Sequence, residues 1–280
     1  MTSRLRASIL VENGPSEDLC CEHGLSVHIR YGELAVLLDF GQSNAFARNA
    51  DALGIDLADV DRAVLSHAHY DHADGMAAFF ARNDHAPLHL SEACAETCWS
   101  SKAGASELHY IGIHAGYLER YRSRLSPAPT SRASRIAPGV HLVPHTTANL
   151  EQLGAQAGML LRTGDRFAPD SFAHEMSLVF ELDGERLAVF NSCSHAGLAA
   201  ITAEVQAAFP GWRIAAYIGG LHLMRSSDEA ILEAAEVIRA ANVAQVYTGH
   251  CTGEHALELL SHELPGRITA LRPGMVIDLD

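Results

Sequence analysis

The sequence predicts an α/β protein in which two mixed β-sheets pack face to face and helices cover the outside. Two blocks of short apolar strands occur along the chain, and in each block helices alternate with strands toward the end. Sheets that bury one face against each other and the other face under helices give this pattern. With 280 residues, 48% of them hydrophobic, the chain can build a substantial core. We expect a single domain over residues 1–280.

The elements of the first block follow from apolar runs and their periodicity. Their predicted order is strand 7–13, strand 25–31, strand 34–41, helix 45–54, strand 63–67 and helix 73–81. The second block repeats the sequence of strands followed by alternating helices. Its predicted order is strands 140–144, 158–164, 177–184 and 186–192, helix 197–209, strand 214–220, helix 227–242, strand 243–250, helix 253–264 and strand 274–280.

The segment at about 99–135 interrupts this pattern, because Gly, Ser and Pro surround one possible helix. Insertions of this kind often lie over functional sites, so we expect a lid. The segment carries several arginines in an otherwise acidic chain. They form either a solvated helix face or an anion-binding surface. The candidates for substrate contact are Arg120, Arg122 and Arg124.

The densest group of potential metal ligands is SHAHYDHADG, residues 66–75. So many imidazoles and carboxylates in one loop would repel or remain unpaired unless a cation lay among them. His67 and His69 point the same way in an extended loop, and Asp71 and His72 follow at the helix entry, where they can reach a second position. An N-cap role for Asp71 would explain one carboxylate and none of the histidines. One segment can thus supply two metal ions.

Further ligands are expected where other strands end, because the carboxyl ends of strands in α/β layers converge on one edge. His195 and His250 each follow a predicted strand and precede a helix, and we assign both as metal ligands. His222 occupies a similar loop between them. It is either a further metal ligand, which we favour less, or a residue with a supporting or substrate-contacting role.

The motif H-x-H-x-D-H resembles the signature of the metallo-β-lactamase superfamily. The stretches CEHGLSVHI, LLDFGQSNAF, HEMSLVF, SCSHAGL, IGGLHL and GHCTGEHA further resemble its Tflp-like, or dihydropterin-synthase-like, branch of metal-dependent hydrolases. The resemblance implies a four-layer αβ/βα sandwich and two divalent metal ions, usually Zn²⁺, with Mn²⁺ or Fe as alternatives. It also implies a small phosphorylated, pterin-like or nucleotide-like substrate.

The sequence departs from the better-known superfamily pattern in its second half. His174 or Glu175 falls where the third histidine would be, and Cys193 falls where a bridging Asp would be. We favour His195, two positions beyond Cys193, as the ligand. Cys193 remains either a ligand or a buried small side chain. If Glu175 is not a ligand, its carboxylate can accept the ring N–H of a ligand histidine and so fix the tautomer of that histidine.

Two metal ions would activate a water molecule for hydrolysis of an ester or phosphodiester, with Asp71 orienting the water or accepting its proton. The alternatives are a di-iron redox protein and a non-catalytic metal-binding module of the same fold. A serine hydrolase and a nicotinamide oxidoreductase are disfavoured, because the chain has neither a G-x-S-x-G elbow nor a dinucleotide fingerprint.

Composition limits the partners and the compartment. The net charge of −14 disfavours nucleic acid as a partner. A small anionic molecule is the expected partner, on the family resemblance and the arginine-rich segment. No apolar run is long enough to cross a bilayer, and the N-terminus does not read as a signal peptide, so we expect a cytoplasmic protein without a membrane partner. Six cysteines are too few for a disulfide framework, and free thiols are expected.

Overall fold

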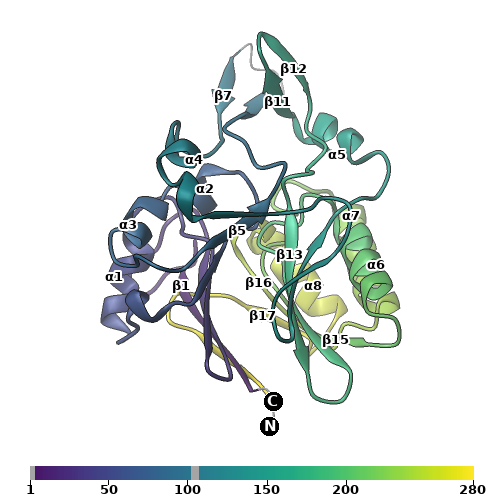
Figure 1. Cartoon of the computed structure of the whole chain (residues 1–280). Coiled ribbons are helices and arrows are strands. Elements are labelled where there is room, and N and C mark those ends of the chain that lie inside the picture. Colours follow the sequence, from purple (N-terminus) through teal and green to yellow (C-terminus); the bar gives the residue numbers. More distant parts are fainter. Residues whose placement is uncertain (1–3, 102–106) are drawn as a thin grey trace.

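The computed structural model describes residues 4–101 and 107–280, which include two seven-stranded sheets (Figure 1). The first sheet is built from strands of the first half of the chain and the last strand. Its order is β18 (Val276–Leu279), β1 (Leu5–Val11), β2 (Ser26–Tyr31), β3 (Leu34–Leu38), β4 (Arg62–Val64), β5 (Leu88–Ser91) and β8 (Leu125–Ala128). The strands from β3 to β8 in this order run parallel, whereas each neighbouring pair among β18, β1, β2 and β3 is antiparallel.

The second sheet is built from the second half of the chain. Its order is β17 (Ile268–Ala270), β16 (Gln245–Thr248), β15 (Arg213–Ile218), β14 (Arg186–Phe190), β13 (Met176–Leu182), β10 (Val140–Pro144) and β9 (Ser134–Ala137). The four strands from β14 to β17 are parallel, and β13 pairs with β14 in the antiparallel sense. Both sheets are mixed, as the sequence predicts.

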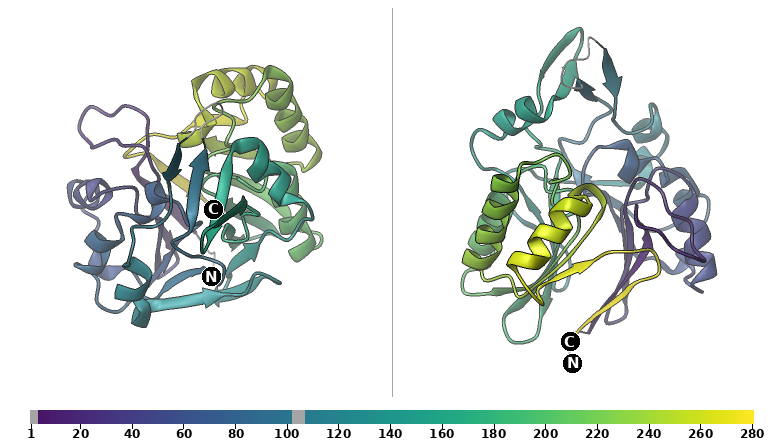
Figure 2. Two further views of the ribbon diagram at one scale, coloured as in Figure 1. Left: turned by 90° about the horizontal axis from the view of Figure 1, so that it is seen from above. Right: turned by 180° about the vertical axis from the view of Figure 1, so that it is seen from behind.

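The two sheets bury a common core and are covered by helices on their outer faces. Val27 and Ile29 of the first sheet belong to the same buried cluster as Leu178 and Phe180 of the second. The outer face of the first sheet packs against α1 (Ala45–Ala52), α2 (Tyr70–Ala73) and α3 (Met76–Phe80). The outer face of the second packs against α6 (Leu198–Ala208), α7 (Asp228–Ala240) and α8 (Glu254–Glu263). This layering, visible in both views of Figure 2, confirms the αβ/βα sandwich.

Local sequence explains where the helices begin and end. Ser227 caps α7 by accepting the N–H of Ala230, and the buried side chains of α7 recur at the spacing of one helical face. The helix expected at 73–81 is instead divided between α2 and α3. Gly75 lies between them, where a Cβ atom would be 2.0 Å from the carbonyl oxygen of Phe40. Within the described ranges, every helix is too short or too polar to cross a bilayer.

A third sheet projects beyond the two large ones, at the top of Figure 1. Its order is β12 (Arg166–Pro169), β11 (Met159–Thr163), β6 (Cys98–Ser101) and β7 (Leu108–Tyr110), with α5 (Leu150–Ala157) packed beside it. The segment 99–135, where the sequence predicts a lid, is divided between different sheets. It includes β8, an integral strand of the first sheet, and the start of β9, while the strand expected at 158–164 contributes to the projecting sheet. Residues 102–106 of the expected lid lie outside the described residues.

The remaining short elements connect these layers. They are α4 (Tyr117–Arg120) and the 3-10 turns Leu57–Asp59, Arg122–Arg124 and His250–Thr252. The carboxyl ends of the parallel strands in both sheets lie at the edge from which the projecting sheet rises (Figure 1). Loops at this edge are therefore brought together from both halves of the chain.

Candidate metal centre

The histidines selected from the sequence lie in loops at this shared edge. His67 and His69 follow β4, His195 follows β14, and His250 follows β16. All four side chains are buried. We select His195 and His250 from the sequence because each follows the end of a strand, which we call the strand-end rule. The fold places them beside His67 and His69, and His250 is more than half the chain length from His67 in sequence.

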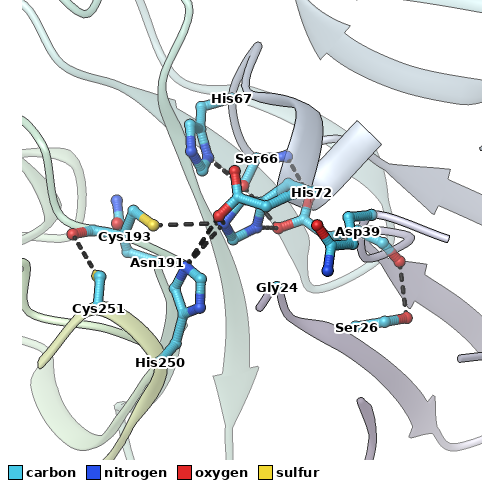
Figure 3. Close-up of polar contacts among 12 residues, drawn as sticks. Gly24, Ser26, Asp39, Ser66, His67, His72, Asn191, Cys193, His250 and Cys251 are labelled. Atoms are coloured by element: carbon cyan, nitrogen blue, oxygen red, sulfur yellow. Dashed lines mark hydrogen bonds and ion pairs between the residues drawn. The ribbon is translucent and has the colours of Figure 1, made fainter. Parts of the chain in front are cut away.

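A buried carboxylate fixes the orientation of two imidazoles in the first loop (Figure 3). Asp39 accepts the backbone N–H and the hydroxyl of Ser66, both at 2.7 Å, and Nδ1 of His72 at 2.8 Å. Because Ser66 donates its hydroxyl proton to Asp39, its oxygen accepts the Nδ1 proton of His67 at 2.8 Å. Both imidazoles therefore direct Nε2, the nitrogen suited to a metal ion, into the site.

His67, His69 and His195 form the first candidate metal position. One ring nitrogen of each lies within 4.8 Å of the others. Nε2 of His67, Nε2 of His69 and both ring nitrogens of His195 are buried without a hydrogen-bond partner among the described residues. Burial lowers the pKa of all three imidazoles, to about 3 for His69, so they are neutral at pH 7. Neutral, unpartnered imidazoles are the form that a divalent metal ion binds.

Asp71, His72 and His250 form the second candidate position. Nε2 of His72 lies 3.1 Å from Nε2 of His250, and Oδ2 of Asp71 lies 3.5 Å and 3.3 Å from these two atoms. Nδ1 of His250 donates to Oδ1 of Asn13 at 2.9 Å, which leaves its Nε2 as a lone pair. Lone pairs and a carboxylate that face one another repel unless a positive charge lies among them.

The charges around the second position favour that positive charge. Burial lowers the pKa of His72, but the carboxylates of Asp71 and Asp39 outweigh burial and raise this pKa to about 10. Burial raises the pKa of Asp71, whereas the imidazoles of His72 and His250 hold it well below its usual range. Asp71 is therefore an anion at neutral pH. A proton on Nε2 of His72 and a metal ion compete for the same place, because a ligand must lose its proton to bind the ion.

Two buried cysteines lie beside these positions (Figure 3). Sγ of Cys193 is 3.3 Å from Nε2 of His72, and ligand atoms of His67, His72 and Cys193 lie within 4.8 Å of one another. Sγ of Cys251 donates to the carbonyl oxygen of Cys193 at 3.5 Å. Burial raises the pKa of the Cys193 thiol well above its usual value. Cys193 thus lies where a thiol can approach both positions, while His195 completes the first.

His174 has a fixed tautomer that sets it apart from the ligand histidines. Its Nδ1 accepts the backbone N–H of Ala68 at 3.2 Å, so its Nε2 carries the proton that is donated to Asp170 at 3.0 Å. His174, Asp170, Cys98 and His69 also bring ligand-type atoms within 4.8 Å of one another. Because Nε2 of His174 is protonated, this group acts as a hydrogen-bonded support behind His69.

Glu175 and His222 both lie next to His195. The two oxygens of Glu175 accept the backbone N–H groups of His195 and Ala196, at 2.8 Å and 2.9 Å. Glu175 therefore holds the backbone of the His195 loop. The sequence predicts that it holds a histidine ring, whereas its hydrogen bonds here go to backbone N–H groups. The ring of His222 is half-buried, with its centroid 4.5 Å from that of His195. His222 can therefore contact a molecule bound at the first position.

The three arginines expected to contact substrate make their contacts elsewhere. The guanidinium of Arg124 donates to the carbonyl oxygens of Asn83 and Ala86, at distances from 2.6 to 3.1 Å. Arg120 lies over the ring of the next residue, 5.3 Å from its centroid, and Arg122 forms an exposed ion pair of 4.0 Å within its own turn. The donors of Arg124 hold the loop before β5.

Several residues around the site were not selected from the sequence, among them Glu12, Asn13 and Asp39. Glu12 accepts the backbone N–H groups of His250 and Gly14, and Asn13 and Asp39 orient imidazoles as described above. Each of the three closely follows a strand of the first sheet, β1 or β3. The strand-end rule would have found them had it been applied to every polar residue rather than to histidine alone.

Residues 21–250 match the family model of the metallo-β-lactamase superfamily, a span that includes the whole ligand loop and most of both sheets. The chain belongs to this superfamily. A member of known structure, Tm1679, described as a metal-dependent hydrolase of the β-lactamase superfamily, shares 26% identity and superposes with a TM-score of 0.83 over 99% of each chain. This agreement confirms the family and the fold predicted from the motif.

Two further proteins are similar to this chain at lower sequence identity. The 7,8-dihydropterin-6-methyl-4-(β-D-ribofuranosyl)-aminobenzene-5'-phosphate synthase of Methanocaldococcus jannaschii is 22% identical over 236 residues, which cover 82% of this chain and 79% of that enzyme. A diphosphatase of the PhnP family is 16% identical, with a TM-score of 0.56 over 100% of this chain and 98% of the other. At that identity the second likeness concerns the fold alone.

Proposed function

We propose that this chain is a binuclear metal-dependent hydrolase of a small anionic ester. The observation that carries the proposal is the convergence of buried ring nitrogens in two adjacent groups, several of them without a partner among the described residues. Burying such atoms without partners destabilises the folded protein, and a bound metal ion would supply the missing partners. The superfamily to which the chain belongs supports metal-dependent hydrolysis in general.

In the proposal, each position takes ligands from both halves of the chain. His67, His69 and His195 hold one ion, and Asp71, His72 and His250 hold the other, with Cys193 beside both. A site rich in imidazole nitrogen with one carboxylate suits Zn²⁺, and Mn²⁺ or Fe are alternatives. When bound, such ions polarise the scissile group and lower the pKa of water. Asp71 stays anionic and can orient the attacking water or accept its proton.

The proposed substrate is a small phosphorylated molecule, either pterin-like or nucleotide-like. The name of the M. jannaschii relative includes a ribofuranosyl phosphate and a pterin, and this supports the proposal. The arginines first considered for the phosphate do not support it, so the positive charge that attracts the anion is assigned to the metal ions.

The test combines metal analysis with hydrolysis assays on the purified protein. We expect about two equivalents of a divalent metal, no visible iron absorption, and hydrolysis of bis(p-nitrophenyl) phosphate that chelation abolishes and Zn²⁺ or Mn²⁺ restores. An iron charge-transfer band with oxygen- or thiol-dependent turnover would support the di-iron redox alternative instead. Full metal content without hydrolysis of any phosphoester or carboxylic ester would contradict the proposal and favour a metal-binding module.

A further inference from the structure

His23 lies on the solvent side of the second candidate metal position. Its side chain is 46% exposed, while every proposed ligand is buried. Nε2 of His23 is 3.3 Å from Oδ2 of Asp71, and its ring centroid is 4.9 Å from that of His250. The strand ends explain this position, because the start of β2 lies at the same sheet edge as the end of β3.

The amide of Asn13 assigns the protons of two neighbouring histidines. The backbone N–H of Gly24, which can only donate, contacts one amide atom of Asn13 at 3.1 Å, so this atom is the oxygen. The same oxygen accepts Nδ1 of His250 at 2.9 Å. The amide nitrogen therefore donates to Nδ1 of His23 at 3.1 Å.

These assignments give the two imidazoles opposite roles. Nδ1 of His250 is protonated, so its Nε2 is a lone pair suited to a metal ion. Nδ1 of His23 accepts a hydrogen bond, so the ring proton is on Nε2, which then cannot be a metal ligand. Oδ2 of Asp71 lies 3.3 Å from that Nε2, a distance longer than a strong charge-assisted hydrogen bond. His23 thus presents a partly used N–H donor beside the metal centre.

The backbone around His23 is held on both sides, so the donor is not on a loose loop. The carboxylate of the preceding Glu22 accepts hydrogen bonds from residues 42–43. The following Gly24 has φ +148°, and a Cβ atom there would lie 2.4 Å from the carbonyl oxygen of Asp71. Only glycine permits this close approach, which places His23 against the ligand loop.

We propose that His23 contacts the substrate, donating a hydrogen bond from Nε2 to an anionic oxygen of the molecule bound at the metal centre. The inference rests on the proposed hydrolase function for the nature of the ligand and on the Asn13 network for the donor. A fixed N–H beside a cationic centre recognises a phosphoryl or carboxylate oxygen and discriminates against a neutral ester. His23 is therefore a specificity-determining residue, distinct from the ligands.

The test compares His23→Ala and His23→Gln with His85→Ala in the metal-loaded protein. His85 is a matched control, because it is also an exposed histidine beside a carboxylate, Asp84 at 3.4 Å. The probes are bis(p-nitrophenyl) phosphate, neutral p-nitrophenyl acetate, and inorganic phosphate in a calorimetric titration. Loss of a hydrogen bond to a charged oxygen should weaken phosphate binding about 10-fold or more and raise KM for the phosphodiester similarly. The acetate reaction and the metal content should stay unchanged.

The outcomes separate this inference from the proposed function. His23→Gln keeps an N–H donor and should recover part of the phosphate affinity, while His85→Ala should match the wild type. If the wild type hydrolyses nothing but His23→Ala still weakens phosphate binding, the hydrolase proposal fails and the inference stands. Loss of a metal equivalent in His23→Ala would make His23 a ligand and overturn the inference. Unchanged phosphate affinity in His23→Ala would also overturn it.

Discussion

Replacement of Asp39 by asparagine tests whether a residue outside the ligand set controls the metal centre. The backbone N–H of Ser66 needs an acceptor, so the amide oxygen of the new side chain would take the place of Oδ1 of Asp39. The amide NH₂ would then occupy the place of Oδ2, facing Nδ1 of His72 and the hydroxyl of Ser66. Two donors would meet there, and His72 would have to lose its hydrogen bond or move its proton to Nε2.

Either response weakens His72 as a ligand, because a protonated Nε2 cannot bind a metal ion. Loss of a carboxylate that orients a ligand histidine typically lowers metal affinity about 10- to 100-fold. At about 1.4 kcal/mol per tenfold change, this corresponds to about 1.4 to 2.8 kcal/mol. The expected effect of Asp39→Asn is thus a drop of this size in the affinity for at least one of the two ions, with the fold retained.

The assay is a competition titration of Zn²⁺ against a chromogenic chelator, with circular dichroism to monitor folding. Asp61→Asn is the matched control. The carboxylate of Asp61 accepts the backbone N–H of Ala35 at 2.8 Å, near the start of β3, whereas Asp39 follows the end of that strand. If folded Asp39→Asn binds both ions as tightly as the wild type, the assignment of the His72 tautomer is incorrect.

Three further predictions follow from the same geometry. His67→Ala or His69→Ala should lose most bound metal and activity in a folded chain, whereas His141→Ala, whose ring pairs with Glu181 at 2.7 Å, should keep both; elemental analysis would decide. His195→Ala and His250→Ala should each lose about one equivalent or about 10-fold in affinity, while exposed His262→Ala should not, and equal behaviour of all three would refute the strand-end rule. Burial and, to a smaller extent, the charge of Arg62 lower the pKa of His89 to about 4, below the value near 6.5 of an unfolded chain. The neutral His89 ring therefore contributes stability above pH 6.5, and this stability is lost as the pH falls toward 4. In chelator-treated protein, the fall in melting temperature from about pH 7 to about pH 5 should be smaller for His89→Gln than for the wild type, and an equal fall would contradict this.

The fold and the clustering of the histidines were predictable because each depends on a local pattern. Alternating apolar runs give the strands, and H-x-H-x-D-H places several candidate ligands in one loop whatever the rest of the chain does. His195 and His250 required one further rule, that parallel strands end at a common edge. That rule needs only the order of strands and helices, which the sequence supplies.

The supporting residues were not predictable, because their roles depend on contacts between distant segments. In the sequence nothing distinguishes Asn13 from other polar residues. Its role arises only from the contacts of its amide with Gly24, His23 and His250. The arginines show the converse, because a dense local pattern suggested a binding surface. Arg124 instead satisfies carbonyl groups of a neighbouring loop, a need that no local pattern reveals.

The proposed ligands of each metal ion come from both halves of the chain, and this bears on whether a variant that lacks one ligand still folds. In the proposed arrangement each ion would connect a loop of the first sheet with a loop of the second. The sheets are already joined by the buried core that includes Val27, Ile29, Leu178 and Phe180. Burial of that core stabilises the fold without metal, unlike a small domain whose folding depends on its ion. A ligand substitution therefore removes one connection at the edge of an intact sandwich, and its loss of metal can be measured in a folded protein.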